Sequence, residues 1–176
     1  MKSELLIGLL CLTSILAQAQ DPATDAAALA KVRFDEGVKA YNNGAYEKAI
    51  GLFSEVLELE PGHLNAYLQR GFCHSLQREY AQAVDDFTAV IRQKPDHLWA
   101  FTSRGSAYGK WGKQELAIAD FNRVLELDPK NQEAYNNRGW AKKALGDHKG
   151  ACDDWHASRK LGNSEAKIIL LNNRCK

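Results

Sequence analysis

The chain has 176 residues, of which 45% are hydrophobic and 26% are charged. This composition is ordinary for one globular domain and excludes a disordered or collagen-like chain. The formal net charge is +1, from 23 basic and 22 acidic side chains, so no overall field draws the protein to nucleic acid or to an acidic membrane surface.

The first 19 residues have the pattern of a secretory signal peptide. Lys2 gives a sparse positive start, the run over 5–17 is apolar but too short to span a bilayer, and Ala17-Gln18-Ala19 is a small-x-small pattern that signal peptidase cleaves. We therefore expect residues 1–19 to be removed, the mature protein to be periplasmic or secreted, and no membrane insertion after cleavage. The alternative, a buried first helix of the domain, is disfavoured because polar residues are nearly absent from the run.

The next part of the chain predicts a series of helical hairpins. Residues 20–29 lead into the first helix, for which Thr24 is the expected N-cap. Apolar residues then recur at steps of three and four, which makes one apolar stripe per helix, and such a helix is stable only when its stripe packs against a neighbour. Each hairpin is a helix, a turn and a second helix, and the four hairpins span residues 30–63, 64–97, 98–131 and 132–165.

The hairpins share small, aromatic and proline positions at a spacing of 34 residues, as in 105 − 71 = 34 for two of the glycines. A glycine inside a helix costs about 1 kcal/mol relative to alanine, so its recurrence indicates that two helices approach closely there. The alanines offer a small opposing surface, the aromatic residues fill the space between adjacent repeats, and the prolines end the second helix. The recurring positions are Gly37, Gly71, Gly105 and Gly139; Ala49, Ala83, Ala117 and Ala151; Phe53, Phe87, Phe121 and Trp155; and Pro61, Pro95 and Pro129.

A charged pair recurs with the same spacing in all hairpins but the first. An arginine precedes the glycine and an aspartate follows the arginine by sixteen residues, as in 86 − 70 = 16. The first hairpin has Glu36 and Leu52 at these places, so acid and base are present or absent together. Because the two positions face each other across an antiparallel hairpin, we predict a structural ion pair in each; the alternative is a row of arginines that binds an acidic ligand. The predicted pairs are Arg70 with Asp86, Arg104 with Asp120, and Arg138 with Asp154.

Residues 166–176 depart from the repeat and predict a capping helix. A stack of repeats leaves one apolar face open at its end, which a terminal amphipathic helix covers. We expect Ile168, Ile169 and Leu171 to cover that face and Lys167 and Asn172 to face water.

The 34-residue pattern resembles the tetratricopeptide repeat, and the resemblance extends over nearly the whole mature chain. It is similar to that of exported bacterial members of the family. The resemblance implies an all-α, right-handed superhelical solenoid of four hairpins plus the capping helix, in which the first helix of each hairpin lines a concave groove. It also implies binding of protein or peptide partners in place of catalysis.

The resemblance further implies which residues line that groove. The groove would be apolar and aromatic in its first half and more polar, with lysines, in its second half. Exposed aromatic groups in a concavity anchor extended or helical peptides, whereas the alternative is that some of these residues, above all Leu76 and Trp99, pack between adjacent helices. The implied lining is Phe34, Val38, Tyr41, Asn42, Leu68, Phe72, Leu76, Trp99, Thr102, Ser106, Lys110, Asn136, Trp140 and Lys143.

One family variant binds C-terminal carboxylates through a clamp of lysine, asparagine and arginine side chains. We do not predict a receptor of that kind, because the corresponding places hold other residues. They hold Phe34, Val38, Gln69, Trp99 and Ser103.

The mature chain keeps an odd number of cysteines, namely Cys73, Cys152 and Cys175. A turn near Gly162 places position 152 opposite the end of the capping helix, so we predict a Cys152–Cys175 disulfide and a buried Cys73. Cys152 and His156 are four residues apart on one helix, a permitted spacing for two metal ligands, but no third or fourth ligand is evident.

The sequence thus favours a non-enzymatic module that holds a peptide segment of an exported or envelope protein in its groove. It contains no Ser or Cys nucleophile in a spacing motif, no complete phosphate-binding loop and no clustered basic charge, so we predict no catalysis, no cofactor and no nucleic-acid partner. The alternative is a self-associating structural adaptor that uses an end face of the stack. A metal-binding protein using Cys152 and His156 is the least favoured reading.

Overall fold

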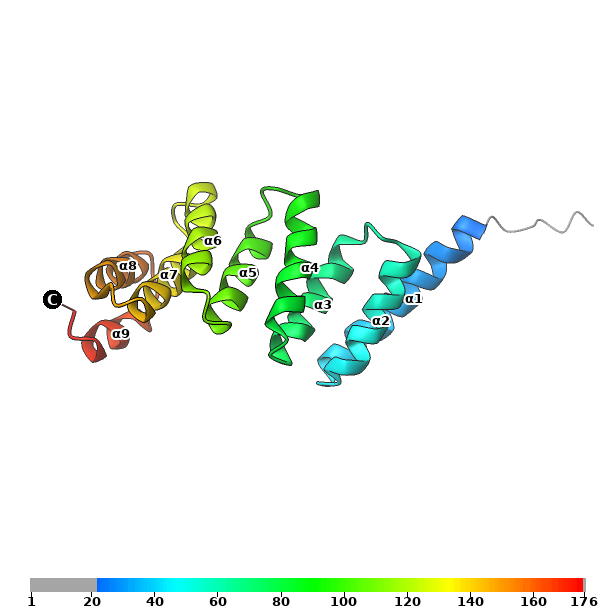
Figure 1. Cartoon of the computed structure of the whole chain (residues 1–176), viewed down its shortest axis with the longest axis horizontal. Helices are drawn as coiled ribbons and strands as arrows, with labels where there is room; N and C mark the ends of the chain where they lie inside the picture. Colours follow the sequence, from blue (N-terminus) through cyan, green and yellow to red (C-terminus); the bar gives the residue numbers. More distant parts are fainter. Residues whose placement is uncertain (1–21, 176) are drawn as a thin grey trace, which may run out of the picture.

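A computed structural model describes residues 22–175, so the signal-peptide prediction for residues 1–19 lies outside the described part of the chain. Within 22–175 there are nine α-helices and no β-strand (Figure 1). In this range no helix is both long and apolar enough to span a membrane. The helices are α1 (Pro22–Asn42), α2 (Tyr46–Leu59), α3 (Leu64–Leu76), α4 (Tyr80–Gln93), α5 (Leu98–Lys110), α6 (Gln114–Leu127), α7 (Gln132–Ala144), α8 (His148–Lys160) and α9 (Ala166–Asn172).

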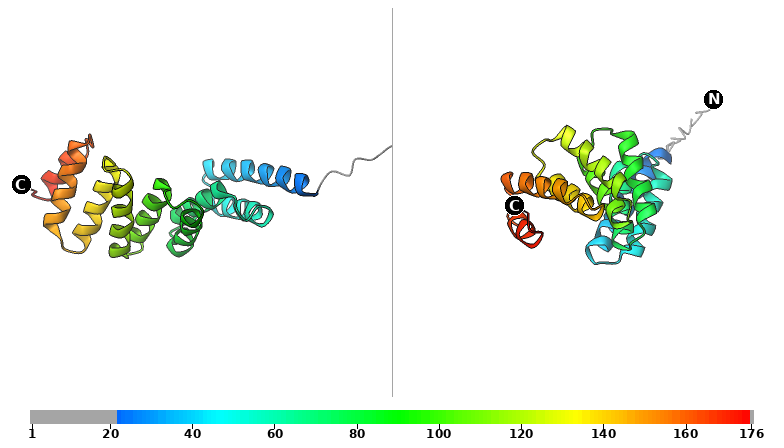
Figure 2. Two further views of the ribbon diagram at one scale, coloured as in Figure 1. Left: turned by 90° about the horizontal axis from the view of Figure 1, so that it is seen from above. Right: turned by 60° about the vertical axis from the view of Figure 1, so that its left-hand side comes forward.

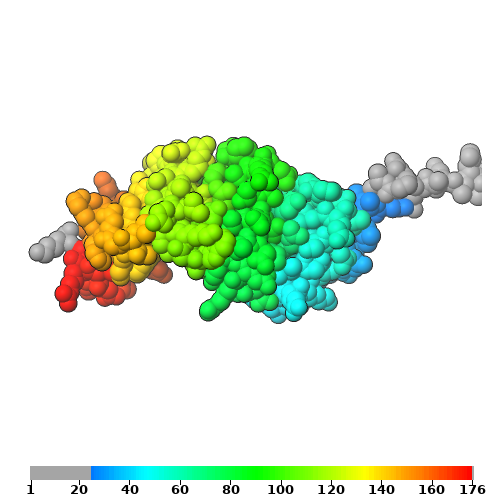
Figure 3. Space-filling view, in the orientation of Figure 1, coloured from blue at the N-terminus to red at the C-terminus, as the bar shows by residue number. Residues whose placement is uncertain are grey.

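The helices form consecutive hairpins that stack along the long axis of the molecule (Figures 1 and 2). Within the described residues each helix packs against the next, and α1, α3, α5 and α7 also contact one another in sequence, whereas no comparable contact joins successive even-numbered helices. The array therefore curves with its odd-numbered helices on the concave side. In the space-filling view each hairpin forms a band beside the preceding one (Figure 3). The fold is the all-α superhelical solenoid that the sequence predicts.

The recurring glycines lie where an aromatic ring of the paired helix touches the backbone. A Cβ atom built on Gly71 would lie 2.8 Å from Cε1 of Phe87, and Phe87 is fully buried. The corresponding distances at Gly37, Gly105 and Gly139 are 2.7, 3.0 and 2.6 Å. A Cβ atom that close cannot be accommodated without displacing the ring, so each hairpin depends on glycine at this position.

Side chains in the connections cap the odd-numbered helices. Nδ1 of His63 accepts a hydrogen bond of 3.0 Å from the backbone N–H of Ala66, and Nδ1 of His97 accepts one of 3.2 Å from Ala100. Asn131 caps α7 in the same way. Each cap satisfies one backbone N–H that the first helical turn leaves unpaired.

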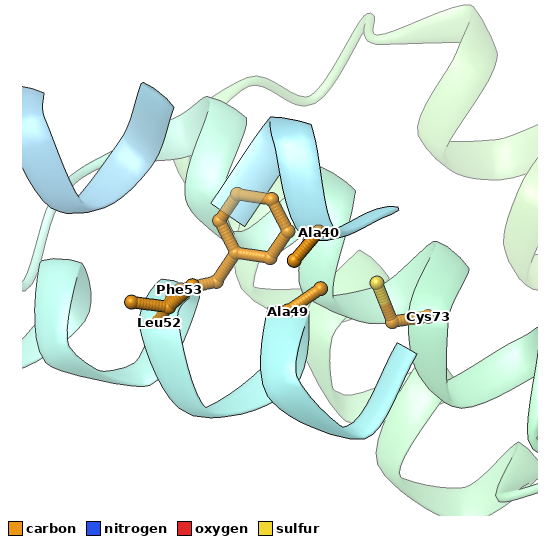
Figure 4. Packing of buried hydrophobic residues seen from close by; sticks show 5 residues of the cluster. All are labelled: Ala40, Ala49, Leu52, Phe53 and Cys73. Carbon is orange, nitrogen blue, oxygen red and sulfur yellow. The ribbon is translucent and has the colours of Figure 1, made fainter. Parts of the chain in front are cut away.

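Cys73 belongs to the core between the first two hairpins. It lies on α3 and packs with Ala40 of α1 and with Ala49, Leu52 and Phe53 of α2 (Figure 4). Its side chain is fully buried, and burial raises the pKa of the thiol to about 11. The structure therefore places Cys73 as a core residue with little thiolate character.

The first helix begins earlier than the sequence predicts. It starts at Pro22, so most of the expected lead-in is helical and Thr24 lies inside the helix and not at its N-cap. Proline suits the first helical position because its fixed φ is helical and its missing N–H would have no partner there.

The C-terminal helix differs from the prediction in length and in orientation. It ends at Asn172, and the side chains of Ile168 and Leu171 are 63% and 78% exposed, so their expected place on the stack is wrong. Leu170 is buried instead and packs with Trp155.

Two links fix this orientation of α9. Cys152 and Cys175 form a disulfide, and Nζ of Lys143 donates a hydrogen bond of 2.5 Å to Oδ1 of Asn173. Both links lie at the end of the helix, and together they determine which side of α9 meets α8.

We expect alanine to have opposite effects at two helical glycines. Gly71→Ala should lower the free energy of unfolding by about 1–3 kcal/mol, since the added methyl group meets the Phe87 ring. Gly51→Ala in α2 should raise it by up to about 1 kcal/mol, since no heavy atom lies within 4 Å of the new Cβ. Urea denaturation followed by circular dichroism measures both, and equal changes at the two sites would refute the close-contact role of Gly71.

Candidate functional site

The predicted arginine and aspartate residues face each other inside their hairpins. In the second hairpin Arg70 donates from Nε and Nη2 to the two carboxylate oxygens of Asp86, at 3.0 and 2.7 Å. The other hairpins repeat this bidentate geometry, with Arg104 on Asp120 and Arg138 on Asp154. The aspartates are buried, and donation to them raises the pKa of each arginine although burial acts against it.

The same arginines also join adjacent hairpins. Nη1 of Arg104 donates to Oγ1 of Thr88 in the preceding hairpin at 3.1 Å. Arg70 bonds Ser54 and Arg138 bonds Asn122 in the same manner. All three nitrogens of each guanidinium group are therefore engaged, which argues against the alternative that these arginines bind an acidic ligand.

The first hairpin lacks the buried arginine–aspartate pair and has a more exposed ion-pair cluster instead. Leu52 is buried where the others have aspartate, and Arg33 lies 2.8 Å from both Glu36 and Glu55. These three side chains are more exposed than the buried pairs of the other hairpins, so their contribution to stability is smaller.

The concave side carries three adjoining hollows that follow the length of α5. The central hollow has a volume of about 270 Å³ and is lined mainly by α3 and α5, with Tyr41 from α1 and Glu133 from α7. A second hollow of about 250 Å³ lies at the N-terminal end of α5 and shares Phe72, Thr102, Ser103 and Glu133 with the central one.

A third hollow of about 320 Å³ lies at the C-terminal end of α5 and shares Ser106 and Lys110 with the central one. Because neighbouring hollows share lining residues, they form one continuous depression, which we call the α5 trough. Its remaining lining includes Trp99 at one end and Trp140 at the other.

The trough exists because the third hairpin has small side chains where its neighbours have large ones. Ser106 occupies the register position that is Phe72 one repeat earlier and Trp140 one repeat later, since 106 − 72 = 34 and 140 − 106 = 34. The two aromatic residues therefore stand on either side of a gap above Ser106.

The trough contains six of the residues that the family resemblance implies for the groove. They are Tyr41, Phe72, Thr102, Ser106, Lys110 and Trp140. Leu76 and Trp99 line it too and are 49% and 71% exposed, so they are not packing residues between helices. Asn42 is exposed at the end of α1 and does not line it.

The other expected groove residues serve packing or local bonding. Phe34 stacks against Phe53 and His63 with ring centroids 5.6 and 5.0 Å apart, and it lies in the core of the first hairpin. The remaining three do not line the trough: Val38 packs in the core beside Phe34, Leu68 packs in the core of the second hairpin, and Asn136 is partly buried.

Lys143 lies beside the trough, bonded to Asn173, with its Nζ 5.1 Å from the centre of the Trp140 ring.

Several trough residues were not predicted from the sequence. Ser75 and Ser103 are neighbours of predicted residues on the same helices. Ser103 is smaller than Gln69 and Asn137 at the same position of the adjacent repeats, which is a signal in the sequence. Glu133 lies in the first turn of α7 at the repeat position that Trp99 occupies in the third hairpin, since 133 − 99 = 34, so the repeat spacing could have indicated it.

The chemistry of the trough is that of binding. It offers aromatic surface, hydroxyl groups and two side-chain charges, and within the described residues no group of three or more His, Cys, Asp or Glu side chains could hold a metal ion. The metal hypothesis for Cys152 and His156 is wrong at Cys152, because that sulfur is bonded to Cys175 and offers no thiolate.

Comparison with known families and structures gives a consistent result. Three family models, each described as a tetratricopeptide repeat, match residues 34–97, 99–131 and 121–153. A search of curated proteins finds no match.

Solved structures resemble the chain over most of its length. MamA 41-end from Desulfovibrio magneticus RS-1 is 25% identical, with a TM-score of 0.73 and coverage of 77% of each chain. The first tetratricopeptide repeat domain of Spaghetti (RPAP3), bound to the HSP90 peptide SRMEEVD, is 28% identical, with a TM-score of 0.64 and coverage of 68% of this chain and 94% of that one. The Arabidopsis OM64 tetratricopeptide repeat domain, at 24% identity and a TM-score of 0.63, shares the fold over 67% of this chain and 98% of its own.

Removing only Asp120 from the buried Arg104–Asp120 pair should lower the free energy of unfolding more than replacing both residues. Asp120→Leu, which copies the first hairpin, leaves the Arg104 guanidinium with 17% exposure and no carboxylate, and should lower the free energy of unfolding by about 3 kcal/mol. The double variant Arg104→Met, Asp120→Leu should recover most of this loss. Urea denaturation of the variants measures these changes. If Asp120→Leu lowers the free energy of unfolding by less than about 1 kcal/mol, the pair contributes no more than a surface ion pair does.

Proposed function

Because this chain belongs to the tetratricopeptide repeat family, whose members bind protein and peptide partners, we propose that it is a non-enzymatic interaction module that holds a peptide segment of another protein in the α5 trough. The observation that carries the proposal is the exposure of two tryptophans in a concavity. Trp99 is 71% and Trp140 is 43% exposed, and each lines one end of the trough. Exposed aromatic residues in a hollow are typical anchors for a bound peptide.

We do not propose that the trough recognises the C-terminal carboxylate of its peptide. The clamp places are occupied by apolar, amide and hydroxyl side chains, and Trp99 and Ser103 at two of them line the trough. An internal peptide segment suits such a surface better, because its backbone and side chains can contact the trough without a terminal charge.

The partner is proposed to be an exported or envelope protein, and this chain is proposed to be exported through its signal peptide to the periplasm or the exterior. Support comes from the sequence pattern of residues 1–19 and from the Cys152–Cys175 disulfide, since disulfides persist mainly in oxidising compartments.

A second candidate function is self-association through the C-terminal end of the stack. Ile168 and Leu171 present an exposed apolar surface on α9, whereas the terminal element of a soluble repeat array ordinarily has a polar outer face. Such an adaptor would use this end face and not the trough.

The trough proposal predicts a loss of binding that depends on which tryptophan is removed. Trp99→Ala combined with Trp140→Ala should weaken capture of a trough-binding peptide by at least about tenfold, because each ring supplies anchoring area. Trp111→Ala is the matched control, since Trp111 is 40% exposed but lies outside the trough. Peptides selected from a displayed random library and measured by fluorescence anisotropy provide the readout.

Equal binding by the wild type and the double variant, with the helical circular dichroism spectrum preserved, would refute the trough as the binding site. Light scattering of the same samples distinguishes the second candidate. A stable oligomer that dissociates on Ile168→Lys and Leu171→Lys would favour self-association.

The export proposal predicts the covalent state of the native protein. Mass spectrometry should find Gln20 at the N-terminus and, without reduction, a single thiol that reacts after denaturation, namely Cys73. Residues 1–19 retained on the native protein would contradict export, and three reactive thiols would contradict the oxidised disulfide.

A further inference from the structure

We propose that the α5 trough selects an extended peptide segment by charge, with a basic residue at the N-terminal end of α5, apolar side chains in the middle and an acidic residue at the C-terminal end. This inference rests on the proposed function and adds the chemistry and orientation of the ligand. It follows from two side-chain charges that have no partner within the described chain and stand at opposite ends of one depression.

The N-terminal end of the trough is acidic. Glu133 lines both the central hollow and the hollow that contains Trp99, and its carboxylate makes no ion pair or hydrogen bond with another described residue. A lysine or arginine of a ligand placed in this hollow would meet the carboxylate and the face of the exposed Trp99 ring. An ammonium or guanidinium group gains from both contacts, since the aromatic face attracts cations.

The C-terminal end of the trough is basic. Lys110 lines both the central hollow and the hollow that contains Trp140, and its ammonium group makes no ion pair with another described residue. Lys143 adds a second ammonium group beside the Trp140 ring, and Asn173, to which it donates, is a neutral partner. The local charge is therefore positive, and an aspartate or glutamate of the ligand would complement it.

The middle of the trough is apolar with hydroxyl groups along it. Phe72, Leu76 and Ala107 give the apolar surface, and Ser103 and Ser106 make no hydrogen bond with other described residues. Those hydroxyl groups can bond the polar backbone of an extended chain.

The spacing of the two ends fixes the length of the ligand. Trp99, which lines the same hollow as Glu133, marks the acidic end. Trp99 and Lys110 are eleven residues apart, since 110 − 99 = 11, and lie on one helix, α5. At about 1.5 Å per helical residue the ends are about 16 Å apart. An extended chain covers that distance in about five residues, so the two charges of the ligand should be separated by about that number.

Charged side chains at helix ends can serve only to stabilise the helix dipole. The experiment must distinguish that role from ligand binding. Lys110 lies in the last turn of α5 and Glu133 in the first turn of α7, where each complements the helix dipole. Matched controls exist for both. Lys160 lies in the last turn of α8 and Glu115 in the first turn of α6, and neither lines the trough.

The test begins with eight-residue random peptides displayed on phage and selected on the full mature chain. The selected peptide with the highest affinity is synthesised together with a twin in which its acidic and basic residues are exchanged. Dissociation constants of both peptides are measured by fluorescence anisotropy for the wild type, for the double variant Lys110→Glu, Glu133→Lys, and for the control Lys160→Glu, Glu115→Lys. We expect the wild type and the control to prefer the selected peptide by about tenfold, and the trough variant to prefer the twin.

The outcomes separate this inference from the proposed function. Selected peptides that lose binding on Trp99→Ala and Trp140→Ala but show no charge preference would overturn the charge inference and leave the trough as a peptide site. Failure to select any peptide that depends on those tryptophans would overturn both. A reversal of preference in the control variant as well would assign the effect to helix dipoles or net field and would also overturn the inference.

Discussion

The contact between a helix backbone and an aromatic ring is the constraint from which the rest of the structure follows. Where the Phe87 ring rests on Gly71, the two helices of the hairpin come closer than a residue with a Cβ atom at position 71 would allow. That close approach brings Arg70 within reach of Asp86, and the same guanidinium group reaches Ser54 of the preceding hairpin. Helix caps, ion pairs and prolines then refine a geometry that the glycine has already set.

Features that repeat could be predicted from the sequence, and features that occur once could not. Arg104 and Asp120 were predictable because three hairpins have the pair and one lacks both partners. The side of α9 that is buried was not, because Ile168 to Leu171 are all apolar and nothing in the sequence ranks them. The disulfide and the Lys143 hydrogen bond decide that question, and both depend on tertiary placement.

The groove was predictable in outline and not in detail for a related reason. A family register names positions on a helix, but whether a side chain there faces the concavity or the core depends on its size and on its neighbours. Phe34 turns into the core beside Phe53, whereas Ser106 leaves a hollow between two aromatic residues. The same register thus provides scaffold at one repeat and surface at another, and departures from the consensus mark the surface.

The arginine of each later hairpin forms hydrogen bonds both within its own hairpin and to the preceding one, and this limits which insertions the chain can accept. Arg104 reaches Thr88, and Arg138 reaches Asn122, by identical spacing, so the joint between hairpins is the same at each junction. Duplication or loss of one whole 34-residue unit would recreate every joint with new neighbours, while any other length would break them. At position 172, one repeat length after Arg138, the chain has asparagine, so this arginine joint is not repeated on α9.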